Sequence, residues 1–243
     1  MNAPDADPRT EEIAANLTRV ADRIAIACAT AGRPPNAVTL IAVTKTFPAE
    51  DVRRLVSLGV RDVAENRDQE ARGKTAELAE LTATTGLRWH FVGQLQRNKA
   101  NHVAAYASVV HSVDRPELAD ALAAAARRSR TGDLDVLLQV SLDPGAAHRG
   151  GVRPLDLPAL ADHVAGATGL RLAGLMAVAP LGADPEPAFA RLADLAARLR
   201  ADHPGATMLS AGMSADLEAA VAHGTTHVRV GTALLGGRPR PVG

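Results

Sequence analysis

Two kinds of hydrophobic pattern follow one another along the chain. In residues 11–30, apolar positions recur at steps of three and four, which places them on one face of a helix. These positions are Ile13, Leu17, Val20, Ile24 and Cys28. Beyond this segment, short β-rich runs alternate with segments of helical period such as residues 48–58 and 186–200. We therefore expect an N-terminal helix followed by alternating strands and helices.

Eight of the short runs predict strands. They cover residues 38–44, 60–64, 88–93, 107–111, 135–141, 170–176, 207–209 and 227–230. Strands that alternate with helices favour a parallel arrangement, because parallel neighbours need the long return path that a crossover helix supplies. Eight repeats favour a closed (β/α)8 barrel of the TIM type over an open doubly wound sheet. No glycine-rich dinucleotide-binding motif follows the first strand, which also disfavours the open sheet.

The domain organisation follows from length and composition. The 243 residues suit one barrel domain or two small domains, and no shift in composition divides the chain. We expect a flexible tail over residues 1–9, which carry acidic residues and prolines, and one barrel domain over residues 10–243. The N-terminus lacks the basic start and apolar stretch of a secretion signal, and no run is long and apolar enough to span a bilayer. With Cys28 as the only cysteine, these features predict a cytoplasmic protein.

The charge balance excludes two classes of partner. The chain has 27 basic and 27 acidic residues, so its formal net charge is zero. Proteins that bind nucleic acid or anionic membranes need a positive surface, and this composition does not supply one. Aromatic residues make up only 2% of the chain, which leaves few platforms for stacking bases. We expect neither nucleic acid nor a membrane as partner, and a small ligand fits better.

Lys45 stands at the end of the first predicted strand. In a barrel of this type, reactive residues lie at the C-terminal ends of the strands. The chain has three lysines against 24 arginines, and Lys45 alone among the lysines ends an apolar strand. An amine can lose its proton and become a nucleophile, whereas a guanidinium cannot. The alternative is a lysine that extends to the rim of the barrel and only covers the strand end.

The ends of the seventh and eighth predicted strands are rich in glycine and hydroxyl groups. The residues concerned are Ser210, Gly212, Ser214, Gly231 and Thr232. Phosphate groups in such barrels commonly bind to the loops after these two strands. Glycine lets backbone N–H groups approach an anion, and hydroxyls add donors. The alternative is two turns that use glycine and serine for backbone geometry, with Ser214 as a helix N-cap.

Six segments of the chain closely resemble the pyridoxal phosphate homeostasis protein family. They are LIAVTK at residues 40–45, AEN at 64–66 with QEA at 69–71, WHFVGQLQRNK at 89–99, GLMAV at 174–178, LSAGMSADLEAAV at 209–221 and VRVGTALLG at 228–236. They occur in the family's order and extend over nearly the whole chain. The family is similar in fold to the N-terminal barrel domain of alanine racemase, so the resemblance implies the same barrel.

The resemblance implies a site for pyridoxal 5'-phosphate (PLP). Lys45 matches the lysine that carries PLP as a Schiff base in the family. Ser210, Gly231 and Thr232 match the residues that hold the cofactor phosphate. This implied phosphate site coincides with the one that barrel geometry places at the ends of the last two strands.

Three further residues match pocket positions of the family. Arg229 matches the arginine set against the pyridine nitrogen, and Asn66 and His90 match polar residues near the ring. Two alternatives remain from the residues themselves: His90 as a hydrogen-bonded histidine inside the third strand, and Asn66 as a turn or cap residue. The family usually has glycine at the position of Ala64 and methionine at that of Ala211, and neither departure touches a cofactor match.

The implied site favours a PLP carrier over an enzyme with robust turnover. An arginine beside the pyridine nitrogen disfavours its protonation, which weakens the ring as an electron sink. Racemases of similar barrel add a C-terminal β domain with a catalytic tyrosine, whereas the only tyrosine here, Tyr106, precedes the fourth predicted strand. We expect no such second domain and no second acid or base.

The sequence thus predicts a protein of intracellular PLP homeostasis that holds PLP on Lys45. Apo forms of PLP-dependent enzymes are the partners expected to receive the cofactor, and a monomer is the expected state. Two other functions remain open. One is an amino acid racemase or another PLP-dependent enzyme, and the other is a barrel that binds a different phosphorylated metabolite with Lys45 as its charge partner.

Overall fold

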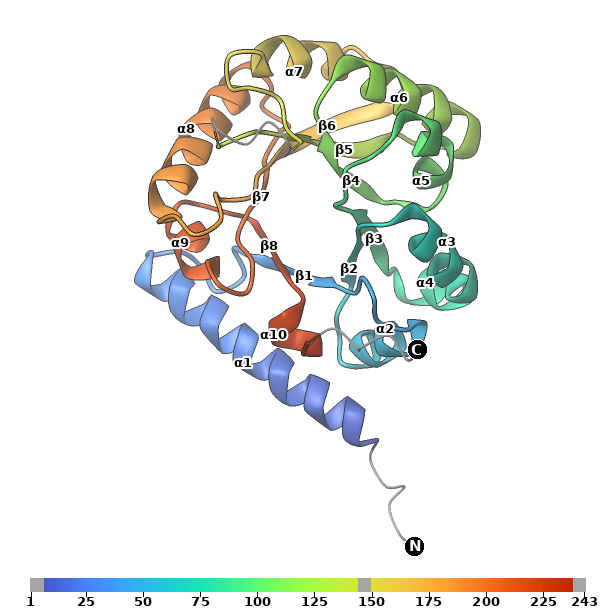
Figure 1. Ribbon diagram of the computed structural model, residues 1–243, viewed down its shortest axis with the longest axis vertical. Helices are drawn as coiled ribbons and strands as arrows, with labels where there is room; N and C mark the ends of the chain where they lie inside the picture. Colours follow the sequence, from blue (N-terminus) through green and yellow to red (C-terminus); the bar gives the residue numbers. More distant parts are fainter. Residues whose placement is uncertain (1–6, 144–149, 238–243) are drawn as a thin grey trace, which may run out of the picture.

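Eight parallel strands form a closed barrel in which each strand pairs with its neighbours in chain order (Figure 1). The computed structural model describes residues 7–143 and 150–237. The strands are β1 (Thr39–Val43), β2 (Asp62–Glu65), β3 (Arg88–Phe91), β4 (Val109–Val113), β5 (Leu134–Gln139), β6 (Leu170–Met176), β7 (Met208–Ser210) and β8 (His227–Val230). Parallel pairing of β1 with β8 closes the ring. The predicted TIM-type barrel is confirmed.

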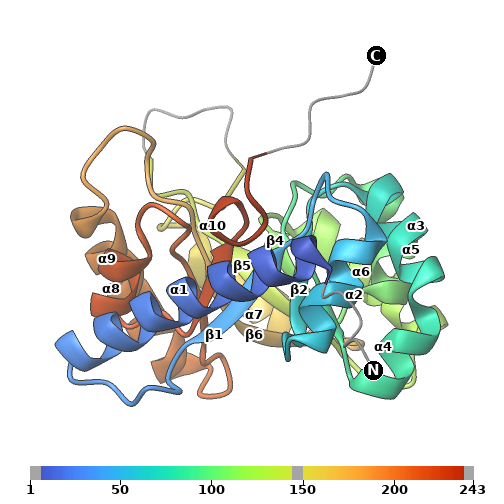
Figure 2. The ribbon, with the colours of Figure 1, turned by 90° about the horizontal axis from the view of Figure 1, so that it is seen from below.

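Helices surround the barrel on its outside (Figure 1). In chain order they are α1 (Pro8–Thr30), α2 (Ala49–Ser57), α3 (Asp68–Glu77), α4 (Ala79–Thr85), the 3-10 turn η1 (Arg97–Lys99), α5 (Ala100–Tyr106), α6 (Pro116–Ser129), α7 (Leu157–Ala165), α8 (Glu186–Asp202), α9 (Leu217–Ala222) and α10 (Thr232–Leu235). Helix α1 crosses the outside of the barrel and packs against α9 and α10 (Figure 2). Among the described residues, no helix combines the length and the apolar character needed to cross a membrane.

Two strands begin two residues later than the hydrophobic pattern indicated, because the preceding helix extends its hydrogen bonds into them. The run at residues 60–64 becomes β2 only from Asp62, since the N–H of Val60 donates to Leu55 at the end of α2. The run at residues 107–111 becomes β4 only from Val109, since the N–H of Ala107 donates to Val103 at the end of α5. β-propensity alone does not show at which residue the helical hydrogen bonds end.

Helix α1 begins at Pro8, three residues before the apolar repeat starts. The carboxylate of Asp7 accepts the N–H of Arg9 at 3.2 Å, and Pro8 occupies the first helical turn, where its missing N–H costs no hydrogen bond. Pro8 and Arg9 are therefore helical, although they fall in the expected tail of residues 1–9. Residues 1–6 of that tail lie outside the described residues.

The apolar core lies mainly between the strands and the helices. Large buried side chains such as Trp89, Phe91 and Phe189 point outward from the barrel or inward from the helices. The barrel interior holds only small apolar clusters, one around Ile41 and one around Leu137. The rest of the interior is polar, so the hydrophobic layer fixes the shape of the barrel and leaves its inside available for hydrogen-bonded side chains.

Gly174 marks a place where the barrel tolerates no side chain. A Cβ at this position of β6 would lie 1.8 Å from the carbonyl oxygen of Met208 on β7, and Gly174 has a φ of 150°. We predict that Gly174→Ala lowers the free energy of unfolding by about 2 to 4 kcal/mol. Gly73→Ala is the matched control, because nothing lies within 4 Å of its Cβ in α3. The control should be stabilised by about 0.5 to 1 kcal/mol. Urea unfolding followed by circular dichroism measures both, and equal stabilities would contradict the packing described.

Candidate functional site

The ends of β1 and β8 lie side by side at the mouth of the barrel, the rim formed by the C-terminal ends of the strands. Ile41 pairs with Arg229 and Ala42 with Val230, so the chain leaves both strands at the same level. A Cβ on Gly231 would come within 3.3 Å of the carbonyl oxygen of Val43, and glycine therefore allows this close approach. Lys45, two residues after β1, thus belongs to the same part of the rim as Gly231.

The connection that carries Lys45 is held by an ionic cluster that we name the Lys74 cluster: the buried residues Lys74, Glu65 and Thr44, with the partly buried Glu70 and the exposed Thr46 at its edge. The amine of Lys74 donates to the carbonyl oxygen of Thr44, to Glu65 Oε1 and to Glu70 Oε1, each at 2.7 Å. Thr44 Oγ1 also donates to Glu65 Oε1 at 2.6 Å, and the N–H of Thr46 donates to Glu70. The residues on both sides of Lys45 are therefore anchored.

Thr46 supports the same interpretation through its backbone. Its φ of 70° lies in the left-handed region, which side chains with a branched Cβ rarely adopt. Such a conformation costs on the order of 1 to 3 kcal/mol and persists only where surrounding contacts impose it. The bond from its N–H to Glu70 is one such contact. The Lys74 cluster thus sets the path of the chain around Lys45.

The residues after β7 and β8 form a compact cradle at the rim. Gly231 precedes α10, and Thr232 occupies the first position of that helix with an exposed side chain. The N–H groups of Leu234 and Leu235 both donate to the carbonyl oxygen of Gly231, so they are not available to an anion, and the hydroxyl of Thr232 is an exposed donor of this segment. Ser214 Oγ accepts the N–H of Ala233 at 3.4 Å and so joins the segment after β7 to α10. Ser214 is not the N-cap of its own helix, because Asp216 stands there.

A hydrogen-bonded chain of five buried side chains crosses the barrel below this cradle. We name it the interior chain: Arg229, Ser210, His111, His90 and Asp62, from β8, β7, β4, β3 and β2. Arg229 Nη1 donates to Ser210 Oγ at 2.7 Å. His111 Nδ1 lies 3.1 Å from that oxygen, and His111 Nε2 lies 2.8 Å from His90 Nδ1. His90 Nε2 lies 2.8 Å from Asp62 Oδ1. Polar groups from five strands are thus satisfied inside the barrel.

Burial sets the charge of the interior chain. It lowers the pKa of Arg229 to about 10, so the guanidinium stays positive at neutral pH, where it also donates to the carbonyl oxygen of Ala177 at 3.1 Å. Burial, followed by electrostatic interaction with the neighbouring His90 and Arg229, lowers the pKa of His111 well below its usual value. The part of the chain nearest the mouth therefore carries one fixed positive charge, which favours an anion there.

Two of the sequence-predicted pocket residues take different places. His90 is 1% exposed, and both of its ring nitrogens have partners in the interior chain. Asn66 follows β2 at the rim, and a Cβ on Gly93 would lie 2.1 Å from the carbonyl oxygen of Asn66, so the two backbones are in contact. Asn66 lines a cavity of about 520 Å³ together with Gln94 and Lys99. Asn66 thus lies at the rim, and His90 lies inside the barrel.

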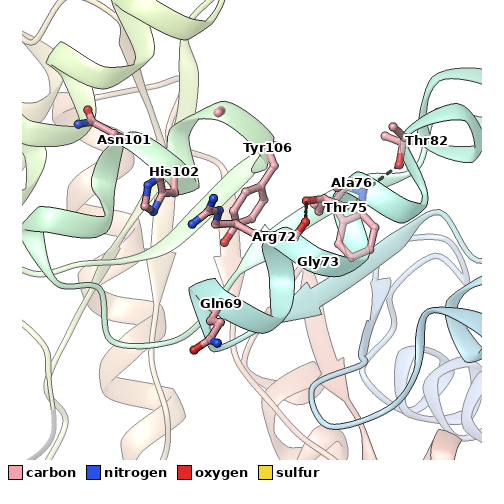
Figure 3. A pocket seen from close by; sticks show the side chains of 12 residues that line it. Gln69, Arg72, Gly73, Thr75, Ala76, Thr82, Asn101, His102 and Tyr106 are labelled. Carbon is pink, nitrogen blue, oxygen red and sulfur yellow. Dashed lines mark hydrogen bonds between the residues drawn. The ribbon is translucent and has the colours of Figure 1, made fainter.

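Tyr106 lies outside the barrel, in a groove of about 870 Å³ between α3, α4 and α5 (Figure 3). It ends α5, just before β4 begins. Its hydroxyl is buried and has no hydrogen-bond partner among residues 7–143 and 150–237. Burial raises the pKa of this hydroxyl far above its ordinary value, with Asp68 adding to the effect.

Sequence reasoning missed the residues that support the site from below. His111 and Asp62 occur inside predicted strands without any spacing that marks them as partners. Glu65 follows the matched residue Ala64 and precedes Asn66, and Lys74 is one of only three lysines. Scarcity of lysine was the one available signal for Lys74, since this chain otherwise uses arginine for its surface cations.

Comparisons with known proteins agree on one group of relatives. The family model described as alanine racemase, N-terminal domain, matches residues 15–239. A pyridoxal phosphate homeostasis protein from Mycobacterium tuberculosis is 47% identical over 244 residues, which cover 95% of this chain and 94% of the relative. Similarity therefore extends over nearly the whole length of both proteins.

Two solved structures are similar in fold and in sequence. A crystal structure of an unknown protein from Bifidobacterium adolescentis has a TM-score of 0.88 and 33% identity, covering 96% of this chain and 98% of its own. The structure of PipY from Synechococcus elongatus PCC7942 with PLP bound has a TM-score of 0.76 and 38% identity, covering 88% of this chain and 100% of its own.

The Lys74 cluster predicts a pH-dependent loss of stability when its cation is removed. Lys74→Met leaves the Glu65 carboxylate buried without the positive charge that compensates its loss of hydration. Removing one partner of such a buried ion pair lowers the free energy of unfolding by about 3 to 5 kcal/mol. Burial already raises the pKa of Glu65, and loss of Lys74 raises it further. A carboxyl with a raised folded-state pKa loses stability as pH rises through that value. The loss should therefore be larger at about pH 8 than at about pH 5.

Chemical denaturation at the two pH values measures this difference. Lys99→Met is the matched control, a half-buried lysine on η1, and it should change the free energy of unfolding by no more than about 0.5 kcal/mol. A loss for Lys74→Met that is small, or that is the same at both pH values, would contradict the role given to the cluster.

Proposed function

The chain belongs to the family of pyridoxal phosphate homeostasis proteins, and from this premise we propose that it holds PLP as a Schiff base on Lys45 and supplies it to other proteins. The relative PipY supports the choice of cofactor, since its structure contains PLP and aligns with 88% of this chain. The proposal assigns the amine to Lys45, the phosphate to Ser210, Gly231 and Thr232, and the pyridine nitrogen to Arg229.

One observation carries the proposal: the chain leaves β1 and β8 at the same level of the rim. The pairing of Ala42 with Val230 puts Lys45, two residues after β1, and the segment after β8 on the same part of the rim, which supports an amine and an anion site there. PLP has an aldehyde at one side of its ring and a phosphate at another, so a site for it needs both groups on one side of the barrel. The donors present here fit that need, with the hydroxyls of Ser210 and Thr232 and the buried guanidinium of Arg229.

The covalent part of the proposed chemistry uses the lysine alone. The neutral amine of Lys45 attacks the aldehyde carbon, one water molecule leaves, and a C=N bond remains. Exchange with the amine of an acceptor protein reverses the link, since one imine replaces another with no net loss of bonds. The anchored residues Thr44 and Thr46 keep the amine at the rim during this exchange.

The same site is poorly equipped for racemisation. Arg229 is a buried, permanently charged group, and a cation beside the pyridine nitrogen disfavours its protonation. A racemase needs a second acid or base on the other face of the substrate. Tyr106 is the only tyrosine of the chain, and it lies in the groove outside the barrel with its pKa raised. We propose a carrier without robust turnover for this reason.

Three further features of the proposed role follow from the same reasoning. We propose that the acceptors are apo forms of PLP-dependent enzymes and that the carrier acts as a monomer. We also propose a cytoplasmic location, which agrees with the free and buried Cys28.

Borohydride trapping tests the covalent link. Purified protein incubated with PLP should gain a visible absorption band, and reduction should fix one cofactor per chain, detected as a mass increment of the intact protein. Lys45→Ala should lose the fixed adduct, because the proposal assigns the aldehyde to this amine and to no other. Lys99→Ala is the control and should keep it. A fixed increment on Lys45→Ala equal to that of the unchanged protein would contradict the assignment.

The phosphate cradle is tested by comparing two ligands. Thr232→Val removes one hydroxyl donor while keeping the shape of the side chain, and a hydrogen bond to a charged group contributes about 1.5 to 3 kcal/mol. We predict that this variant binds PLP at least about tenfold more weakly in an equilibrium titration. Pyridoxal, which lacks the phosphate, is the internal control and should bind both proteins equally. Equal weakening for both ligands would place the phosphate elsewhere.

A further inference from the structure

The hydrogen bonds of the interior chain run in one direction. Arg229 Nη1 donates to Ser210 Oγ at 2.7 Å, so this oxygen acts as an acceptor. The hydroxyl hydrogen of Ser210 must then go to a different atom. Within the described part of the protein, the acceptor in reach is His111 Nδ1, at 3.1 Å. Ser210 therefore donates into the barrel.

With Ser210 as the donor to His111, the tautomers of both histidines follow. A neutral imidazole has one donor and one acceptor nitrogen, so His111 with an acceptor Nδ1 carries its hydrogen on Nε2. It then donates to His90 Nδ1, 2.8 Å away. His90 carries its own hydrogen on Nε2 by the same rule and donates to Asp62 Oδ1 at 2.8 Å. Burial opposes ionisation of Asp62, but the hydrogen bonds from His90 and Arg88 lower its pKa, and it is an anion.

This direction conflicts with an anion at the cradle. A phosphate oxygen next to Ser210 needs a donor, yet the hydroxyl hydrogen already lies on the bond to His111. The conflict disappears when every bond between Ser210 and His90 reverses. Ser210 then donates to the phosphate, His111 donates from Nδ1 to Ser210 Oγ, and His111 Nε2 accepts from His90 Nδ1.

Counting hydrogens shows what the reversal requires. His111 holds one ring hydrogen before and after, moved from Nε2 to Nδ1. His90 holds one before, on Nε2, and two after, because Nδ1 becomes a donor while Nε2 keeps its bond to Asp62. Asp62 stays ionised throughout. The reversed chain thus contains one more proton than the original, and that proton comes from solvent.

On the basis of the phosphate site proposed above, we propose that the interior chain is a reversible relay that takes up one proton at His90 when an anion occupies the cradle. His90 and His111 are positioning residues in this account, since they act on the ligand only through Ser210. The bound anion then lies at one end of the interior chain and the carboxylate of Asp62 at the other. Both negative charges offset the positive charge of the added proton.

The groups around His90 are compatible with this uptake. The titratable and charged side chains that face it are Asp62, Arg88, His111, His227 and Arg229, from β2, β3, β4 and β8. Burial lowers the pKa of His227 to about 4, so this ring stays neutral and does not compete for the proton. Arg88 Nη2 donates to Asp62 Oδ2 at 2.9 Å and lies 2.8 Å from Oδ1, the oxygen that is also 2.8 Å from His90 Nε2. The added charge therefore faces a carboxylate that His90 shares with Arg88.

Calorimetry with pyridoxine 5'-phosphate tests the relay. This ligand has an alcohol in place of the aldehyde, so it probes the cradle without a Schiff base on Lys45. At about pH 8 its phosphate is a dianion before and after binding. Titration in two buffers of different ionisation enthalpy gives the number of protons taken up. We expect about one proton for the unchanged protein and about none for His90→Gln, which keeps a donor to Asp62 but cannot be protonated.

Nitrogen NMR of the histidine rings supplies a second readout that needs no variant. His111 should carry its hydrogen on Nε2 in the free protein and on Nδ1 with the ligand bound. His227→Gln is the matched control, because it removes another interior imidazole outside the chain, and its proton uptake should equal that of the unchanged protein. Binding without proton uptake, or with His111 in the same tautomer throughout, overturns the relay alone. Failure of the ligand to bind overturns the phosphate cradle, and the relay with it.

Discussion

The parallel pairing that closes the barrel between β1 and β8 is the constraint on which the site depends. The two strands are separated by most of the sequence, yet the pairing of Ala42 with Val230 sets their ends at one level. Gly231 makes this possible, because any side chain there would press on the carbonyl of Val43. Lys45, after the first strand, and the proposed anion cradle, after the last strand, thereby belong to the same part of the rim. Neither group would form a site for PLP without the other.

Around this closure, the protein separates its apolar and polar interactions. The hydrophobic layer lies between strands and helices, where it stabilises the barrel. The inside of the barrel contains the interior chain, whose hydrogen bonds hold the side chains of Arg229 and Ser210 in place below the mouth. The Lys74 cluster does the same for the backbone on either side of Lys45. Both networks are buried, so each is costly to disrupt and each fixes a functional group in position.

The sequence predicted the barrel, its eight strands and the family resemblance, and the fold and the family are confirmed. Periodicity and chain order suffice for these, because each strand is a local signal and parallel order follows from alternation. The interior chain was not predictable in this way. Its bonds join residues from five strands, so partners such as Asp62 and His111 become visible only when the register is known. Residues at strand starts were also misplaced, since helix ends compete for the same backbone groups.

A crystal structure of the protein grown with PLP would test the central claim most directly. Our account predicts continuous electron density from Lys45 Nζ to the cofactor, with the phosphate at Gly231 and Thr232 beside the first turn of α10. The side chain of Lys45 would then point into the mouth between the ends of β1 and β8. A structure with Lys45 turned away from the mouth, or with the phosphate bound outside the cradle, would contradict the account.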